Sequence, residues 1–252
     1  DDLSMAKLVL TATGNPTVNF ASPVSCGVLE VNGAVKFTTQ NNLTATLTIP
    51  ADSTVAFGTM AVTSGIALVG EGTLKLDPGV GADYTGATFL PASAFNNFAG
   101  TLHVVSGRYQ PGAAINSNVK IKVTHGGQIW PSSGTWNNAF EISGRGWKSD
   151  GNLVEQNALR IDTTIGSSAT IKVVDDPDHT PTAIGSTANR TIHAIFSGSG
   201  DLELRGAGAM TINEPYHPDF TGKVTSTSDF TLGKNDGLSA NSPIKFDAEI
   251  VV

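Results

Sequence analysis

Short runs of alternating polar and apolar residues, separated by glycine turns, constrain this chain of 252 residues more than any other feature. In the segment 196–232, Leu202 and Leu204 alternate with charged residues, and a threonine separates Met210 from Ile212. A period of two residues indicates half-buried β-strands rather than helices. Each predicted strand offers about two inward apolar side chains, which is too few for a core of its own. Such a unit becomes stable only by stacking on others like it.

An earlier stretch, residues 69–109, repeats this arrangement. The sequence GEGTLKL, which begins at Gly70, matches GSGDLEL, which begins at Gly198. In the same way FAGTL, which begins at Phe98, matches FTGKV, which begins at Phe220. The spacing between matching positions drifts along the chain, so the loop lengths differ while the order of the strands persists, as is usual in repeat arrays.

Length and composition fit one continuous domain. Charged residues make up only 15% of the chain, and a hydrophobic content of 39% is enough for a continuous core. No segment has the composition of a linker, so we expect a single domain over residues 1–252, with an internal repeat at about 65–130 and 193–252. The net charge of −7 argues against nucleic acid and anionic membranes as partners, because both need clustered Lys and Arg. No apolar run approaches the ~20 residues that a membrane-spanning helix needs.

The spacing of the predicted strands indicates an all-β fold. Strands recur about every 8 to 14 residues, which suits a sandwich, a barrel or a β-helix. The absence of any helical pattern of about ten residues excludes α/β folds. Because each unit must stack on its neighbours, we expect a parallel β-solenoid, with a β-sandwich as the alternative. A coil of roughly 20 to 25 residues would give about ten coils, stacked at ~4.8 Å.

The glycine-and-leucine pattern carries a resemblance to a known family. The sequence GSGDLELRGAGAMTI, followed by DFTG and then DFTLG, resembles the autotransporter-associated β-strand repeat of large bacterial surface proteins. The segments AFEISGRGWKSDGNL and LGKNDGLSANSPIKF resemble the stretches before and after such a repeat. The resemblance covers roughly residues 65–252, and longer loops at 78–91 and 215–218 depart from the pattern. It implies a right-handed parallel β-helix, secretion and a structural or adhesive role at the cell surface, and it implies no catalytic residues.

All three tryptophans of the chain lie close together, at Trp130, Trp136 and Trp147. Aromatic side chains can pack in an interior ladder, or they can present their faces to sugar rings. The neighbouring residues are mostly Ser, Thr, Asn and Gly rather than aliphatic, which suits a surface that contacts glycans. Core packing is the default interpretation of such rings, and the three tryptophans are also the best glycan-contact candidates in the chain.

An acidic, proline-interrupted loop over residues 175–190 contains Asp175, Asp176 and Asp178. Three carboxylates so close in sequence are candidate ligands for a hard cation such as calcium, the one cofactor that the sequence suggests. The spacing matches no EF-hand, and no glycine lies where a calcium loop turns. A solvated surface loop is therefore the preferred interpretation, and a cation site is the alternative.

A second polar loop suggests a catalytic alternative. Glu214, His217 and Asp219 are candidates for acid, base and orienting group in glycoside cleavage. The matching loop of the first copy carries alanine and asparagines instead, which favours a structural loop. We therefore expect no catalytic residues, and a β-helix enzyme that binds or degrades polysaccharides is the alternative function.

The two ends of the predicted solenoid are apolar. The first strand contains Leu8 and Leu10, and the chain finishes on Ile250, Val251 and Val252. A solenoid exposes unpaired backbone groups at each end, and no polar cap or covering helix is evident in the sequence. We therefore expect the ends to pair with other copies of the chain or with flanking repeats. A head-to-tail stack does not close, so it would grow into a fibre or surface layer. A loop that folds back over each end is the alternative.

The first residues of the chain suit an extracellular location. The chain begins with Asp-Asp rather than Met, which suits a mature secreted protein after processing and equally a piece cut from a longer array. The one cysteine, Cys26, excludes an intrachain disulfide, and a small buried residue is its expected role. We expect an extracellular structural or adhesive β-solenoid, with surface glycans as further partners.

Overall fold

The computed structural model describes residues 3–19, 24–37, 43–58, 65–79, 82–85, 89–148, 157–178, 180–213, 217, 219–227 and 229–232. In these residues the chain forms 26 β-strands and one short 3-10 helix, η1 (Ala92–Phe95). The described part of the chain contains no helix long and apolar enough to cross a membrane.

The described strands belong to four sheets. The N-terminal sheet contains β1 (Leu3–Thr11), β3 (Val24–Asn32), β5 (Leu43–Ile49), β7 (Ile66–Gly70) and β10 (Asn97–Phe98). The nine-stranded sheet contains β2 (Thr17–Val18), β4 (Ala34–Phe37), β6 (Thr54–Phe57), β8 (Thr73–Leu76), β11 (Thr101–Val104), β13 (Lys120–Val123), β16 (Ala139–Ile142), β19 (Thr170–Val173) and β22 (Ile195–Ser197). The seven-stranded sheet contains β9 (Asp83–Thr85), β12 (Gly107–Gln110), β14 (Gly127–Ile129), β17 (Leu159–Arg160), β20 (Thr182–Ser186), β23 (Leu202–Gly206) and β25 (Val224–Ser226). The C-terminal sheet contains β15 (Thr135–Trp136), β18 (Thr164–Ile165), β21 (Arg190–Ile192), β24 (Met210–Ile212) and β26 (Phe230–Leu232).

Every pairing between the described strands is parallel, and each strand pairs with the equivalent strand of the next coil. In the nine-stranded sheet, for example, Lys36 pairs with Ala56 and Ala56 pairs with Lys75, so a coil takes about 20 residues. The chain is therefore a parallel β-solenoid of about nine turns, which confirms the predicted fold class. The β-sandwich alternative is wrong, because it needs packed antiparallel sheets.

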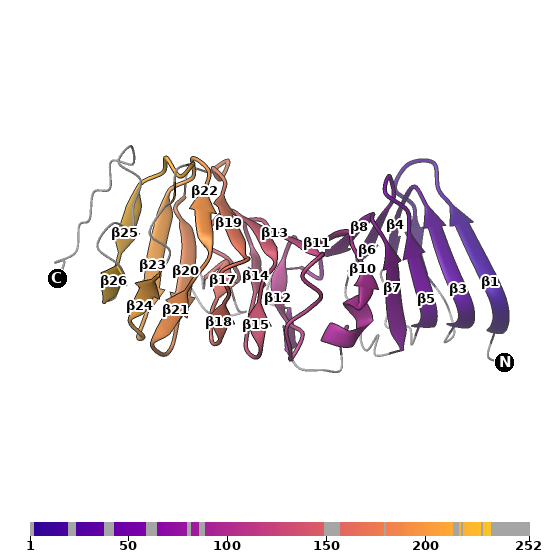
Figure 1. Cartoon of the computed structure of the whole chain (residues 1–252). Coiled ribbons are helices and arrows are strands. Elements are labelled where there is room, and N and C mark those ends of the chain that lie inside the picture. The colour runs from indigo at the N-terminus through magenta and orange to yellow at the C-terminus, as the bar shows by residue number, and fades with distance from the viewer. Residues whose placement is uncertain are drawn as a thin grey trace.

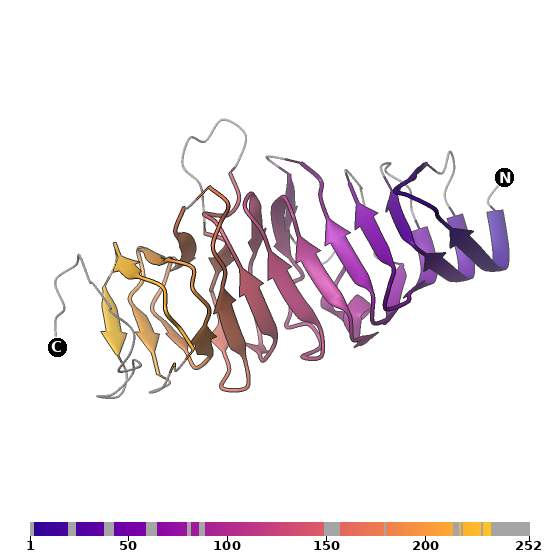
Figure 2. The ribbon, with the colours of Figure 1, turned by 90° about the horizontal axis from the view of Figure 1, so that it is seen from above.

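The coils stack along one axis. Figure 1 shows the strands in succession from β1 at one end of the molecule to β25 and β26 at the other. The view from above in Figure 2 shows the same progression, with the strands of neighbouring coils running side by side. Each coil therefore contacts mainly the coils before and after it, as in other repeat architectures.

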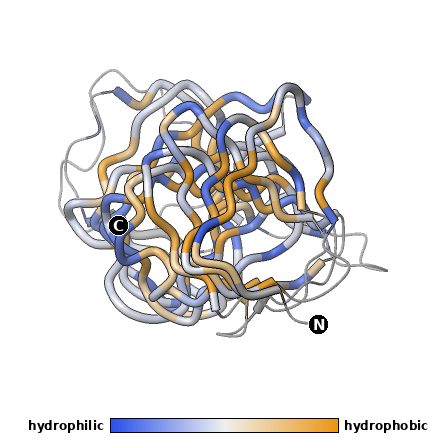
Figure 3. Tube along the Cα trace, turned by 90° about the vertical axis from the view of Figure 1, so that its right-hand side faces the viewer, coloured by the Kyte–Doolittle hydropathy of each residue, from blue (hydrophilic) through white to orange (hydrophobic). Residues whose placement is uncertain are grey.

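The core is built from columns of apolar side chains, one from each coil. One column of the nine-stranded sheet consists of Val35, Val55, Leu74, Leu102, Ile121, Phe140, Ile171 and Phe196. All of these side chains are buried. Viewed along the axis, the hydrophobic stretches concentrate toward the middle of the cross-section (Figure 3). Burial of one aliphatic side chain stabilises the fold by about 1.5–3 kcal/mol. The two or three apolar side chains of a single strand are buried only when the neighbouring coils cover them.

Glycines form the corners where the chain passes from one sheet to the next. Gly70, the last residue of β7, has a φ of +108°, and Gly198, between β22 and β23, has a φ of +98°. A Cβ atom on Gly198 would lie 2.0 Å from the carbonyl oxygen of Val173 in the preceding coil. These corners therefore need glycine for the backbone conformation and for the close approach of two coils.

The two matching segments occupy equivalent steps of the coil but different sheets. The leucines of the first segment, Leu74 and Leu76, lie on β8 in the nine-stranded sheet. Those of the second, Leu202 and Leu204, lie on β23 in the seven-stranded sheet. The shared sequence thus specifies a corner followed by a strand, and this unit is used on more than one face of the solenoid.

Candidate functional site

At the N-terminal coil, the described part of the chain gives β1 a partner strand on one edge only. Among the described residues, β1 pairs with β3 and with no other strand. Leu8 and Leu10 on β1 are half-buried and pack against the core, while Val9 between them is 45% exposed. Backbone groups and apolar side chains are therefore available together at this end. The matching prediction for Ile250, Val251 and Val252 lies outside the described residues.

Two of the three tryptophans belong to a layer of arginines and aromatic rings on the seven-stranded sheet. The Arg108 guanidinium lies 5.0 Å from the ring centroid of Trp130 and 4.4 Å from that of Trp147. A second guanidinium, that of Arg160, lies 3.7 Å from the Trp130 centroid. The Trp130 Nε1 donates a hydrogen bond to Asp162 Oδ2 at 2.8 Å. This arrangement stabilises the fold by cation–π attraction between consecutive coils.

The tryptophans do not form the exposed platform that the sequence suggested. Trp136 is fully buried and Trp147 is 5% exposed, so the glycan-contact prediction is wrong for both. Trp130 is half-buried, and the two guanidinium groups occupy ring surface that a sugar would need. A glycan contact by Trp130 stays a prediction.

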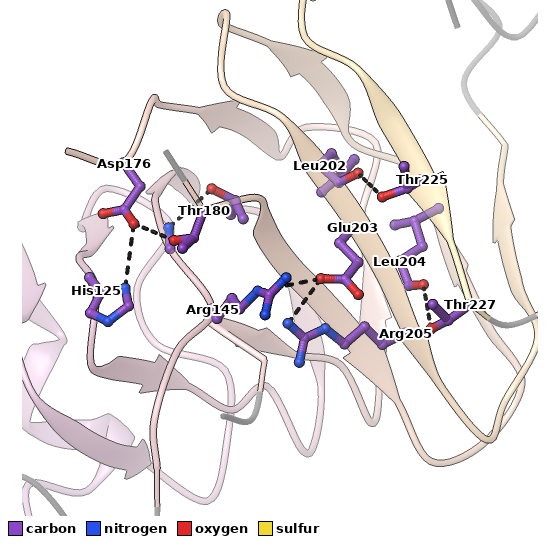
Figure 4. A network of polar contacts seen from close by, with 12 residues as sticks. His125, Arg145, Asp176, Thr180, Leu202, Glu203, Leu204, Arg205, Thr225 and Thr227 are labelled. Atoms are coloured by element: carbon purple, nitrogen blue, oxygen red, sulfur yellow. Dashed lines mark hydrogen bonds and ion pairs between the residues drawn. The ribbon is translucent and has the colours of Figure 1, made fainter. Parts of the chain in front are cut away.

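The acidic loop does not gather its three carboxylates around one point. Asp175 accepts a hydrogen bond from the Ser199 hydroxyl at 2.9 Å, and Asp178 is exposed. Asp176 is buried, accepts a hydrogen bond from the Thr180 hydroxyl and lies 3.5 Å from His125 Nδ1 (Figure 4). Within the described ranges, no group of three or more His, Cys, Asp or Glu side chains could hold a metal ion. The calcium prediction for these three residues is therefore wrong, because each carboxylate has different surroundings.

A second polar cluster in the same view ties two coils together. Glu203 on β23 accepts a hydrogen bond from Arg205 Nη2 at 3.0 Å and pairs with Arg145 Nε at 3.8 Å (Figure 4). The Thr225 and Thr227 hydroxyls donate to backbone carbonyls of β23. Both arginines are engaged by protein groups, so this cluster is structural.

The candidate catalytic loop is described only in part. His217 is buried, and its Nδ1 accepts a hydrogen bond from the Phe196 backbone N–H at 3.0 Å. The same imidazole packs edge-on against the Phe196 ring, with ring centroids 5.4 Å apart. Asp219 is exposed, and Glu214 lies outside the described residues. The contacts of His217 are those of a residue that holds two coils together.

A row of lysines on the outer face of the nine-stranded sheet is the most regular polar feature of the described surface. The register aligns, coil by coil, Thr17, Lys36, Ala56, Lys75, His103, Lys122, Glu141, Lys172 and Ser197. The lysine row, which we define as Lys36, Lys75, Lys122 and Lys172, therefore occupies every second coil. The residues that flank each lysine in its strand are buried, so the lysines point outward.

Sequence reasoning missed this row, although each lysine has a local signal. Each lies between two apolar residues, in the tripeptides VKF (35–37), LKL (74–76), IKV (121–123) and IKV (171–173). The tripeptides are unevenly spaced along the chain, because the intervening coils carry loops of different lengths. Only the strand register shows that the four lysines fall into one line.

The lysine row creates a local positive field around His103. Burial lowers the pKa of His103 to about 4, and the nearby Lys122 and Lys75 add to this effect, against smaller opposing contributions from Glu141 and Asp77. The His103 Nε2 lies 3.1 Å from the Thr124 hydroxyl. At neutral pH the imidazole is therefore uncharged.

We predict that His103 makes the fold sensitive to mild acid. The pKa of His103 is about 4 in the folded chain and 6.5 for the free side chain. Between pH 4 and pH 6.5 the unfolded chain therefore binds more protons than the folded chain. Stability from this residue is present above pH 6.5 and is lost as the pH falls toward 4. In His103→Gln, the drop in melting temperature between pH 7 and pH 5 should be smaller than in the wild type by about 2 °C. Equal drops in calorimetric scans of the two proteins would contradict this assignment.

Comparison of the chain with protein-family models, with curated protein sequences and with solved structures finds no match in any of the three. Its function is therefore argued from its own geometry.

Proposed function

We propose that this protein is an extracellular structural or adhesive β-solenoid, without catalytic activity, that extends by pairing its N-terminal coil with another copy or with a flanking repeat. The observation that carries the proposal is the open side of β1, where unpaired backbone groups lie beside Leu8 and Leu10. A parallel strand edge is a ready template for further pairing.

The apolar positions of β1 suit such a contact. In the interior coils the equivalent side chains are buried; Leu8 of β1 is aligned with Leu29 of β3, which is fully buried, and with Leu47 of β5, which is also fully buried. Leu8 itself remains half-buried because no described strand covers it. A further coil docked on β1 would complete both the backbone ladder and the apolar column.

The open end implies a particular type of assembly. The surface that would dock on β1 lies elsewhere on the partner, so the contact is heterologous and does not close into a ring by symmetry alone. Repeated addition along the solenoid axis would build a rod or fibre. The extracellular location is supported by the resemblance of the 198–233 segment to repeats of bacterial surface proteins.

The test is the state of association of the whole 252-residue chain. Light scattering and electron microscopy at increasing protein concentration should show growth into linear assemblies. The double variant Leu8→Lys/Leu10→Lys places two ammonium groups on the docking face and should shift the onset of assembly to concentrations at least about tenfold higher.

The matched control is Val9→Lys, which adds a charge to the same strand at its exposed position. This variant should assemble like the wild type, because Val9 is not part of the inward apolar column. Wild-type protein that stays monomeric at millimolar concentration would overturn the self-assembly proposal. Release of reducing ends from a panel of polysaccharides would overturn its non-catalytic part.

A further inference from the structure

We propose that the lysine row on the nine-stranded sheet binds a linear acidic polysaccharide, with its chain extended along the solenoid axis. The chemistry that fits is a polysaccharide of disaccharide units that each carry one carboxylate. This surface is separate from the open edge of β1, so the inference does not depend on the self-assembly proposal.

The spacing of the lysines is the first argument. Neighbouring coils are ~4.8 Å apart, so lysines on every second coil recur at about 9.6 Å. An extended polysaccharide with one uronate in each disaccharide unit presents its carboxylates at a similar interval. Six coil steps separate Lys36 from Lys172, so the row is about 29 Å long, enough for several such units in register.

The shape of the surface is the second argument. Between β11 and β22 the sheet is hollowed into an open groove of about 440 Å³, whose lining combines the polar Lys122, Thr170 and Lys172 with the apolar Ile121 and Phe140. The groove crosses several consecutive coils, as an extended ligand requires. Its ammonium groups and hydroxyls can donate to carboxylates, and the hydroxyls can also accept from sugar hydroxyls.

A row of threonines runs beside the lysine row. Thr54, Thr73 and Thr101 are aligned on consecutive coils of the nine-stranded sheet. On their strands they stand one outward position before Ala56, Lys75 and His103, which are the positions aligned with the lysine row. A ligand that follows the lysines would therefore meet a hydroxyl group on each of these coils.

The charge balance of this face is the third argument. The protein has a net charge of −7, yet this face gathers five of its fifteen lysine and arginine residues when Lys120 is included. Glu141 is aligned with the lysine row, and its carboxylate lies 2.8 Å from the Lys122 ammonium and 3.4 Å from the Lys172 ammonium. These two contacts lower the pKa of Glu141. Lys36 pairs with Asp77 at 3.6 Å, but neither Lys75 nor Lys120 forms an ion pair with a described residue. The face therefore keeps uncompensated positive charge that suits a polyanion.

The composition of the face separates a glycan from other polyanions. Proteins that bind single-stranded nucleic acid interleave basic residues with aromatic side chains on which bases stack. Apart from the His103 imidazole, the outward positions aligned with the lysines on this sheet are Thr, Ala, Glu and Ser. A hydroxyl-rich, non-aromatic strip fits the polar edges of an extended polysaccharide better than it fits bases.

Calorimetric titration with a hyaluronan oligosaccharide long enough to cover the row tests the inference at low salt. The wild type should bind it saturably, and the affinity should fall as salt rises. Lys75→Gln/Lys122→Gln should weaken binding at least about tenfold, whereas Glu141→Gln, which removes the carboxylate that pairs with Lys122 and Lys172, should strengthen it about threefold to fivefold. A gain of affinity cannot come from misfolding.

Three controls make the outcome specific. Lys223→Gln removes a lysine that precedes β25 on another sheet and should bind within about twofold of the wild type. The oligosaccharide with its carboxylates methyl-esterified should not bind. In NMR titrations, the bound acidic oligosaccharide should raise the pKa of His103 above its value in the free protein, because it cancels the field of the neighbouring lysines.

Unchanged affinity in Lys75→Gln/Lys122→Gln, or equal binding of the esterified oligosaccharide, would overturn the inference. A single-stranded DNA oligomer or vesicles of anionic lipid that bind as tightly, with the same dependence on the lysines, would also overturn the assignment to a glycan.

Discussion

Replacing Trp136 with alanine should lower the free energy of unfolding by about 3–5 kcal/mol. Trp136 is the largest fully buried side chain in the described part of the chain. It packs against Phe140, with ring centroids 6.3 Å apart, and its Nε1 donates a hydrogen bond to the Ser133 carbonyl at 3.0 Å. The substitution leaves a cavity between stacked coils, and the rigid parallel ladders on either side limit how far the coils can collapse into it.

Guanidinium denaturation followed by circular dichroism measures this loss. The control is Thr135→Ala, which changes the exposed neighbour on the same strand and should alter the free energy of unfolding by no more than about 0.5 kcal/mol. A loss below about 1 kcal/mol in Trp136→Ala would show that the indole lies at the surface, where the sequence-based hypothesis of a glycan platform placed it.

The fold class could be predicted from the sequence because the periodicity and the glycines act locally. The alternation around Leu202 and Leu204 assigns one face of the strand to the core, whatever strand lies next to it. Glycines at positions such as 70 and 198 mark the corners. Since strands this short cannot form a core alone, stacking follows from the physical requirement to bury apolar surface.

The burial of the tryptophans could not be predicted from local composition. Trp136 lies between Thr135 and Asn137, which are both exposed, and polar neighbours of this kind suggested an exposed ring. In a β-strand, however, adjacent side chains point to opposite faces, so polar neighbours are what an inward residue has. Alternation was the better guide at this position than the character of the neighbours.

The prediction of a metal site in the acidic loop was wrong for a related reason. Asp175, Asp176 and Asp178 are close in sequence, but adjacent residues of an extended loop face different directions. Asp176 turns inward toward His125 and Thr180, while Asp175 meets Ser199 of a later coil. Closeness in sequence therefore does not place three carboxylates around one ion.

The lysine row is the opposite case, because residues that are distant in the sequence are aligned in the fold. One coil separates Lys75 from Lys122, and Glu141 and Lys172 lie on adjacent coils. The loops that connect these coils differ in length. No constant period in the sequence connects these residues. Their alignment follows from hydrogen-bond register, which depends on long-range pairing.

Replacing Gly198 with alanine should destabilise the solenoid by about 2 kcal/mol or more beyond the cost at Gly79, a glycine with the same φ angle. Both residues have a φ of +98°. At Gly198 a Cβ atom would lie 2.0 Å from the Val173 carbonyl oxygen, whereas at Gly79 nothing lies within 4 Å of it. The comparison therefore isolates the close approach of two coils from the strain of the φ angle.

Gly79→Ala carries only the conformational cost, which is about 1–3 kcal/mol. Gly198→Ala adds a clash with backbone, which a side-chain rotation cannot relieve; β22 must move away from β19, and the Ile171–Phe196 pairing in the core column weakens with it. Denaturation midpoints of the two variants and the wild type, measured side by side, provide the test. Equal losses in the two variants would show that the corner can shift without disturbing the stacked coils, and that the glycine is required there for its φ angle alone.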